Sequence, residues 1–352
     1  MNYSVALEDC IMQKDKPATA GSNILEGFVS PINATVVDRL KAENIEIAGR
    51  VAMDEFGLRD PFAEDFGEVS AAVKSVVDGK YSACLCNDLF GKYRRQSAEN
   101  GVCYIHPTYG TVSRFGLIPL ACSMDQIGLV CKNLADGFKL LSIIAGKDEG
   151  DGAMFPEISY SYSQAKKDIT LGIPNGIVNN SDKILKGKFA CADIELKHFD
   201  LYKQAMYILG SAEISGNLSR YDGIKFGHRA KEFRGVNDLY LKTRTQGFGL
   251  STKLAVVMGS MALSQDYYQP YYEKSLELRR VIKESLKFDE YDVIALPCKI
   301  NGNAWDNLSL YALANLAGLP SVAFSYDGQG IMLIANVNCE SLLLKAWEVS
   351  LA

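Results

Sequence analysis

The chain has 352 residues, 48% of them hydrophobic and 22% charged, which is a globular composition with enough apolar residues for a large core. Its net charge of −5 argues against the overall positive charge that is typical of nucleic-acid-binding proteins. We therefore expect no direct nucleic-acid binding, although a local basic patch is still compatible with this net charge. No apolar run reaches the roughly 18 residues that a membrane-spanning helix needs, so we also expect no membrane insertion.

The chain contains nine cysteines, an odd number, and most of them lie in apolar runs. We therefore expect buried, reduced thiols and a cytoplasmic location rather than a disulfide framework. Cys84 and Cys86 alternate along a strand-like run, but no second cysteine pair with zinc-site spacing follows. None of the three histidines lies at ligand spacing from another, so we expect no metal and no other cofactor.

In the first part of the chain, strand-like and helical patterns alternate. Residues 4–11 are typical of a strand that leads into a loop, and residues 33–35 precede an amphipathic helix. A short strand is expected at residues 45–50, a helix at 70–77 and a buried strand at 81–86. This alternation predicts an α/β fold built on a central sheet.

Residues 101–151 form the most distinctive stretch. A turn-rich run at 106–110 is followed by a Gly-punctuated segment and by a helix from about 133 to 144, for which Gly146 is a plausible C-cap. The apolar residues at helical spacing are Leu134, Phe138, Leu141 and Ile144. We expect a packed strand–loop–helix unit here.

The last third of the chain predicts further helices and strands. Two helices are expected around residues 251–264 and 267–286, and a buried strand run follows at 291–297. Residues 308–324 are expected to close the sheet, and a final helix covers about 341–348.

Residues 101–151, with the runs PTYGTVSRFGL, SMDQIGL and AGKD, resemble the amidase-signature family, and within it the A subunits of glutamyl-tRNA(Gln) amidotransferase. Residues 20–56, 213–229 and 241–249 extend the resemblance, which leaves gaps after Phe56, near 183–196 and after Cys298. It implies an α/β fold with a mixed central β-sheet flanked by helices on both faces. It also implies a single domain over residues 1–352 that lacks the family's usual N-terminal helical segment.

The resemblance also implies an active site whose three chemical groups are replaced in this chain. In the family, a serine attacks an amide carbonyl, a second serine transfers the proton and a lysine acts as the base. Glu8 stands at the position of the lysine, Glu68 at that of the bridging serine and Lys92 at that of the nucleophile. The kept residues of the nucleophile loop are Asp88, Gly91 and Arg94. Since losing one triad member costs several orders of magnitude in rate, we expect no amide hydrolysis.

If the fold is kept, Glu8, Glu68 and Lys92 should meet, and three interpretations stay open. The first is a structural ion cluster that fills a disused pocket, which is not necessarily stabilising. The second is a binding or acid/base site for another ligand, because two close carboxylates raise one pKa. The third is a local misalignment that leaves the three groups in solvent.

Other positions bear on ligand binding. Arg220 lies where the family holds the carboxylate of the substrate glutamine, but arginine also makes structural pairs. The family's aspartate for the substrate amino group falls on Leu308, with Asp306 nearby, which argues against glutamine binding. Ser70 is either a surviving signature serine or a helix-start residue.

These residues lead to three functional hypotheses. The first is a degenerate A-subunit homologue without activity, a structural or regulatory partner of B- or C-type amidotransferase subunits or a homo-oligomer. The second is an active amidase or glutaminase, or new chemistry that uses Glu8, Glu68 and Lys92. The third is a decaying copy. A site filled by side chains favours the partner role, and an open pocket with converging charges favours a ligand or a reaction.

Overall fold

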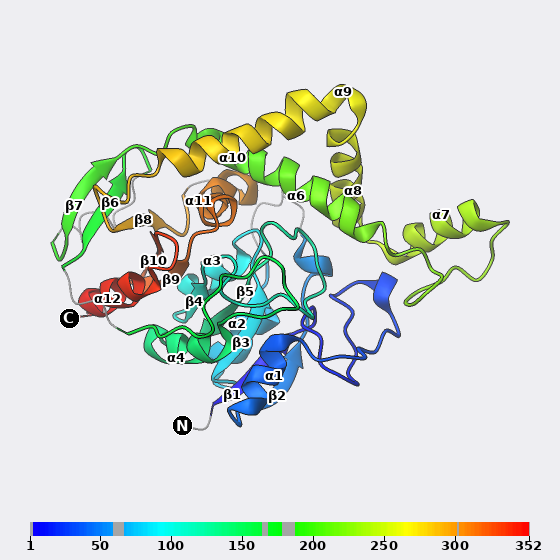
Figure 1. Cartoon of the computed structure of the whole chain (residues 1–352), viewed down its shortest axis with the longest axis horizontal. Helices are drawn as coiled ribbons and strands as arrows, with labels where there is room; N and C mark the ends of the chain where they lie inside the picture. Colours follow the sequence, from blue (N-terminus) through cyan, green and yellow to red (C-terminus); the bar gives the residue numbers. More distant parts are fainter. Residues whose placement is uncertain (1–2, 59–66, 164–167, 178–186, 301–302, 352) are drawn as a thin grey trace.

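The structure is a computed structural model that describes residues 3–58, 67–163, 168–177, 187–300 and 303–351 (Figure 1). Its centre is a ten-stranded sheet in the order β2-β1-β3-β5-β4-β9-β10-β8-β6-β7. The strands are β1 (Ser4–Glu8), β2 (Glu46–Val51), β3 (Ala83–Asn87), β4 (Cys103–His106), β5 (Ile127–Cys131), β6 (Thr170–Pro174), β7 (Ala190–Ile194), β8 (Val293–Pro297), β9 (Ser321–Tyr326) and β10 (Gln329–Ala335).

The sheet is mixed, as expected. Strand β1 runs parallel to both β2 and β3, and β6 runs parallel to both β7 and β8. The central pairs, from β3 through β5, β4, β9 and β10 to β8, are antiparallel. Because β1 and β3 are parallel neighbours, their carboxyl ends lie side by side, and the chain leaves both strands at the same edge.

Helices cover both faces of the sheet. One face carries α1 (Thr35–Ala42), α4 (Leu134–Ile144) and α12 (Glu340–Leu351), which pack beside one another. The other carries α2 (Ala71–Val77), α3 (Lys92–Glu99), α11 (Ala304–Ala317) and α6 (Tyr202–Leu218). An outer layer of α8 (Leu250–Ala262) and α10 (Lys274–Ser285) packs on α6. No helix in the described ranges is long and apolar enough to cross a membrane.

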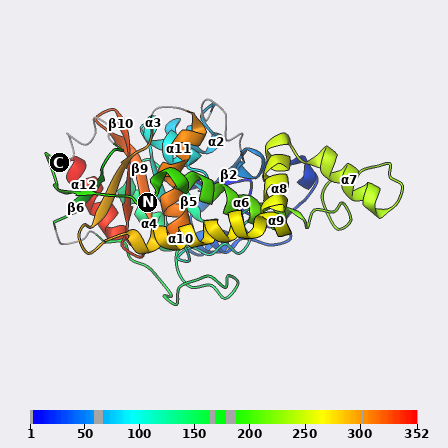
Figure 2. The ribbon, with the colours of Figure 1, turned by 90° about the horizontal axis from the view of Figure 1, so that it is seen from above.

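One helical segment stands away from the sheet. Helix α7 (Val236–Gly247) protrudes from the body, and both Figure 1 and Figure 2 show it at the end of the long axis. Its near end packs on the short 3-10 helix η1 (Asn23–Leu25). After α8, the chain turns through α9 (Gln265–Tyr267) and the π-helix η4 (Tyr268–Glu273) into α10.

Most elements expected from periodicity are confirmed. Of the run at 308–324 that was expected to close the sheet, however, only β9 joins the sheet, and most of the rest belongs to helix α11. Helix α4 begins after Asn133, whose side chain accepts from the Asp136 amide, and Gly146 follows its last turn with a φ of 128°. The strand–loop–helix unit of residues 101–151 contains two strands, β4 and β5, rather than one. In the trimmed region near residues 183–196, the described part contains strand β7, and residues 178–186 lie outside the described ranges.

Candidate functional site

Glu8 lies at the carboxyl end of β1 and is fully buried. Its carboxylate accepts hydrogen bonds from the Tyr93 hydroxyl, from the Asn87 amide at 3.0 Å and from the Cys10 thiol at 3.5 Å. Burial raises the pKa of Glu8 from 4.5 to about 7, against the opposing effect of these donors. The carboxyl group of Glu8 is therefore enclosed by the protein.

Lys92 is the first residue of α3, and its ammonium pairs with Asp54 rather than with Glu8. The Nζ–Oδ2 distance is 2.7 Å, and the two side chains are 12% and 31% exposed. The positive charge of Lys92 also lowers the pKa of Glu8. This effect is smaller than that of burial and smaller than those of the three hydrogen bonds. The structure thus brings Glu8 and Lys92 near one another without a direct ion pair between them.

The loop before Lys92 is held by Asp88 and Arg94, which are both buried. Asp88 accepts from the backbone amides of Tyr93 and Arg94 and pairs with the Arg94 guanidinium at 3.0 Å. Arg94 also donates to the Tyr311 carbonyl and to the Asn315 side chain on α11. These kept residues therefore stabilise the turn and the start of α3.

Gly91 makes this turn possible. Its φ is 82°, a conformation that L-residues with a side chain rarely adopt. A Cβ at this position would overlap the Tyr311 ring. The glycine is therefore required both by the backbone and by the close approach of α11.

The structure does not bring Glu68 into this cluster, which corrects the expected meeting of three charges. Its side chain is exposed, and no described residue forms an ion pair with its carboxylate. Its backbone carbonyl accepts from the Gln96 side chain, whose oxygen in turn accepts from the Ser70 amide. Ser70 caps α2 by accepting from the Val73 amide, so it is a helix-start residue. These contacts hold residue 68 by its backbone and leave its side chain in solvent.

Arg220 lies apart from Glu8, at a pocket of about 360 Å³ that Arg114, Asp125 and Asp151 also line. Its guanidinium donates to the backbone and side-chain oxygens of Asn217, and no described acid pairs with it. Hydrogen bonds connect this pocket to the buried site, because the Asn87 amide donates to Glu8 while its side chain donates to Asp125 at 2.9 Å.

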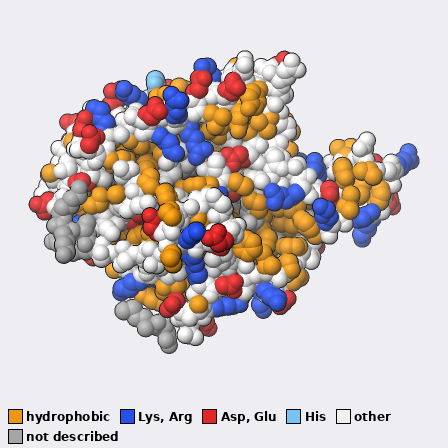
Figure 3. Space-filling view, in the orientation of Figure 1, with side chains coloured by type: hydrophobic (Ala, Val, Ile, Leu, Met, Phe, Trp, Pro, Cys, Tyr) orange, Lys and Arg blue, Asp and Glu red, His pale blue; other side chains and the backbone are white. Residues whose placement is uncertain are grey.

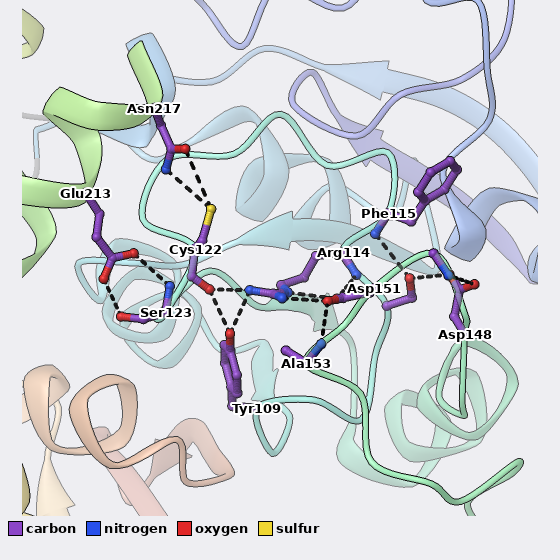
Figure 4. Close-up of polar contacts among 12 residues, drawn as sticks. Tyr109, Arg114, Phe115, Cys122, Ser123, Asp148, Asp151, Ala153, Glu213 and Asn217 are labelled. Carbon is purple, nitrogen blue, oxygen red and sulfur yellow. Dashed lines mark hydrogen bonds and ion pairs between the residues drawn. The ribbon is translucent and has the colours of Figure 1, made fainter. Parts of the chain in front are cut away.

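The wall of this pocket is a polar network that Figure 4 shows. Arg114 donates to both oxygens of Asp151, at 2.6 and 2.8 Å, and to the Tyr109 hydroxyl. Burial acts to raise the pKa of Asp151, but the bonds from Arg114 outweigh it and hold the pKa at about 2. Cys122 presents its thiol to Asn217 beside this network. Arg114 is therefore neutralised, whereas Arg220 is not.

The residues expected to replace the family's aspartate do not reach this pocket. Leu308 is buried in α11. Asp306 forms a capping box with Asn303 at the start of α11 and lies 3.5 Å from the Lys203 ammonium. Its carboxylate is thus engaged at a helix terminus.

Sequence reasoning missed Tyr93 and Asp54, the partners of Glu8 and Lys92. Tyr93 carries no motif of its own, but it follows Lys92 directly in the first turn of α3. Asp54 lies in the run MDEF, which the resemblance covers without assigning it a role. The pairing of these residues depends on how β1, α3 and the loop after β2 pack together.

Comparison with known proteins concerns the family and the fold. The sequence profile of the amidase family, described as Amidase, matches residues 3–60 and 87–326. The unmatched interval between these ranges includes Glu68 and α2.

Curated relatives cover most of the chain. The A subunit of the glutamyl-tRNA(Gln) amidotransferase of Lachnoclostridium phytofermentans is 33% identical over 365 residues, which are 91% of this chain and 74% of that protein. The corresponding protein of Listeria monocytogenes is 34% identical over 394 residues, 97% of this chain and 81% of that protein.

Solved structures share the fold. The crystal structure of the glutamyl-tRNA(Gln) amidotransferase A subunit from Thermotoga maritima aligns with a TM-score of 0.70 at 22% identity, over 97% of this chain and 81% of that one. A 6-aminohexanoate cyclic dimer hydrolase complexed with substrate aligns with a TM-score of 0.75 at 16% identity, over 99% of this chain and 84% of that one. With the family profile and the curated relatives, these findings establish that the chain belongs to the amidase family and is similar to amidotransferase A subunits.

Proposed function

We propose that this protein is a non-catalytic homologue of amidotransferase A subunits and acts as a structural or regulatory partner of other subunits. One observation carries the proposal. The triad-equivalent side chains that lie near one another are both engaged inside the protein, Glu8 by Tyr93 and Lys92 by Asp54.

The chemistry of these groups supports the proposal. Covalent amide hydrolysis needs a nucleophile beside a base that can take its proton. An ammonium paired with a carboxylate has no free lone pair, so Lys92 cannot attack a carbonyl in this state. Glu8 is fully buried, so a substrate cannot contact it without displacing Tyr93. Glu68 supplies no hydroxyl and lies at the surface.

A partner role fits the relatives and the regions that resemble them. Those relatives are named as subunits. The segments with the most amidotransferase-like sequence, residues 213–229 and 241–249, belong to the end of α6, the following loop and α7. Of these elements, α7 forms the projection of the molecule (Figure 1), whereas the end of α6 packs against the body.

The test is ammonia release from glutamine and hydrolysis of simple amides by the purified full chain. It is made alone and with the B and C subunits of the host amidotransferase, with Lys92→Ala as the control. We expect no turnover in any combination, together with a stable complex. Turnover that Lys92→Ala abolishes would replace this proposal with a catalytic one.

A second candidate function is the binding of a small anionic ligand in the pocket beside Arg220. The observation that favours it is that the Arg220 guanidinium lies at the pocket and forms no ion pair with an acid in the described part of the chain. The pocket volume of about 360 Å³ is within the usual range for small ligands. Titration with glutamate and with inorganic phosphate, against Arg220→Gln, tests it. Binding that Arg220→Gln does not weaken would contradict it.

A further inference from the structure

Helix α8 has one buried face and one exposed apolar face. Its buried residues are Thr252, Ala255, Gly259 and Ala262, which pack on α6. The packing is close, because a Cβ on Gly259 would overlap the Ser211 carbonyl oxygen. The opposite face is a stripe, which we call the α8 stripe, of Leu250 (74% exposed), Leu254 (43%), Val257 (64%) and Met261 (39%).

The α8 stripe has the spacing of a helix-pairing surface. Its members are separated by four, three and four residues, which is the a/d repeat with which one helix packs against another. The stripe is about 16 Å long, or three helical turns. Scattered exposed apolar residues are common on protein surfaces, but a continuous row at this spacing is a mark of an interaction site.

A groove accompanies the stripe. It lies between α6, α7 and α8, and its volume is about 740 Å³. Val256 and Val257 line it from α8, Leu218 from α6, and Leu241, which is 67% exposed, from α7. Of the four residues of the α8 stripe, Val257 lines the groove, so the groove adjoins the stripe at this residue.

The charge around this groove is positive. No acidic residue occurs between Asp238 and Asp266, whereas this interval contains Lys242, Arg244 and Lys253. Lys242 pairs with Asp238 at 3.0 Å, so the positive charge at the groove comes from Arg244 and Lys253. Arg244 and Lys253 line the groove, and no acid lines it. Figure 3 shows the protruding segment, at the right of the view, with Lys and Arg side chains and fewer acidic ones around hydrophobic residues.

One acid reaches the start of α8 from outside this interval. Glu55 accepts hydrogen bonds there from the Gly249 amide and the Thr252 hydroxyl. The Glu55 carboxylate therefore stabilises the first turn of α8. It is not among the residues that line the groove with Arg244 and Lys253, the basic rim of the groove.

We propose that the α8 stripe and its groove bind an amphipathic helix of a partner protein, with an apolar face flanked by acidic residues. The stripe spacing selects a helix, and the basic rim selects acidic flanks by charge complementarity. This inference deepens the partner role proposed above and rests on it, by naming the surface and the chemistry of the partner.

Other occupants fit the surface less well. A second copy joined through this same surface would bring two basic rims together, which is unfavourable. A nucleic acid would leave the aliphatic row uncovered, because it is bound through basic groups and aromatic stacking. A bilayer would not fill a groove that is lined by polar Asn237, Thr245 and Ser260.

The test is fluorescence anisotropy with a labelled synthetic peptide of about three heptads, with Leu at a and d and Glu at e and g, added to the full chain. Repulsion between the Glu flanks keeps the peptide from pairing with itself. A second peptide has Lys at e and g. The variant is Leu254→Glu/Val257→Glu, and the matched control is Leu276→Glu/Val281→Glu, an exposed Leu and Val on α10. A Lys253→Gln variant tests the rim.

We expect the Glu-flanked peptide to bind the wild type and the control with equal affinity. It should bind the stripe variant roughly tenfold more weakly than the wild type. It should also bind Lys253→Gln more weakly than the wild type. Binding should also weaken with salt. Three results would overturn the inference: no binding, equal binding by the stripe variant, or equal binding of the Lys-flanked peptide. Tighter binding of anionic phospholipid vesicles or single-stranded RNA to the same surface, or a dimer that the stripe variant dissociates, would also overturn it. Ammonia release from glutamine by the wild type would contradict the non-catalytic role, and this result is independent of the peptide-binding measurement.

Discussion

The Tyr93 hydroxyl donates a hydrogen bond to the Glu8 carboxylate, and both side chains are shielded from solvent. The two residues come from the end of β1 and the first turn of α3. In this enclosed position the pKa of Glu8 is raised to about 7, because burial disfavours its charged form. The site therefore contains a proton that is bound more tightly in the folded than in the unfolded chain.

Replacing Glu8 with Gln should remove a pH dependence of stability. The pKa of Glu8 rises from 4.5 to about 7 on folding, so its contribution to stability is fully present below pH 4.5 and is lost as pH rises to about 7. The difference in unfolding free energy between the wild type and Glu8→Gln should shift by about 3 kcal/mol across this window, in favour of the variant at high pH. Urea unfolding at both ends of the window measures it. Glu68→Gln, at an exposed position, serves as the control and should show no such shift.

Removing the Tyr93 hydroxyl should destabilise the protein more at high pH than at low pH. In Tyr93→Phe the Glu8 carboxylate loses a donor, at a cost of about 1–3 kcal/mol that is largest when the carboxylate is charged. Tyr104→Phe is the matched control, because Tyr104 is equally buried, stacks on Tyr93 and donates only a long 3.5 Å bond to the Cys86 carbonyl. Chemical unfolding of both variants in acidic and alkaline buffer compares them. Equal losses at both pH values for Tyr93→Phe would contradict the pairing.

The turn before α3 should not accept a side chain. Gly91→Ala combines a φ of 82° with a clash against the Tyr311 ring, and we expect a loss of about 3 kcal/mol or more. Gly79→Ala is the matched control, because its φ is 69° but nothing lies within 4 Å of the added Cβ. Its cost should be only about 1 kcal/mol, from backbone strain alone. Thermal and urea unfolding measure the difference, and equal effects would show that the contact with α11 is unimportant.

Restoring a serine at position 92 should not restore hydrolysis. Lys92→Ser supplies the family's nucleophile, but Glu8 provides no amine base and Glu68 no bridging hydroxyl. We expect ammonia release from glutamine at the level of the buffer blank, for Lys92→Ser and Lys92→Ala alike. Turnover by Lys92→Ser that Lys92→Ala lacks would contradict this expectation and would mean that Lys92 alone blocks hydrolysis.

Much of the secondary structure could be predicted from residue order. Local periodicity was sufficient for α4 because its apolar residues recur along one face and Asn133 marks its start. Strand β3 was equally predictable, since it is a continuous apolar run. Strand β10 was not expected, although it pairs with both β8 and β9. The assignment of Glu8, Glu68 and Lys92 to the family's catalytic positions rests on the sequence resemblance and stays a prediction.

Which groups meet depends instead on tertiary packing. Glu8 and Tyr93 are 85 positions apart, and Lys92 and Asp54 are 38 apart, so their pairing requires the packing of β1, α3 and the loop after β2. Glu8 and Glu68 were both expected to meet Lys92, but residue 68 is held by hydrogen bonds to its backbone and its side chain is exposed. Likewise, the apolar spacing of α8 predicts a helix, but only its packing on α6 determines which of its apolar residues stay exposed, because burial is a property of the neighbours that a helix face meets.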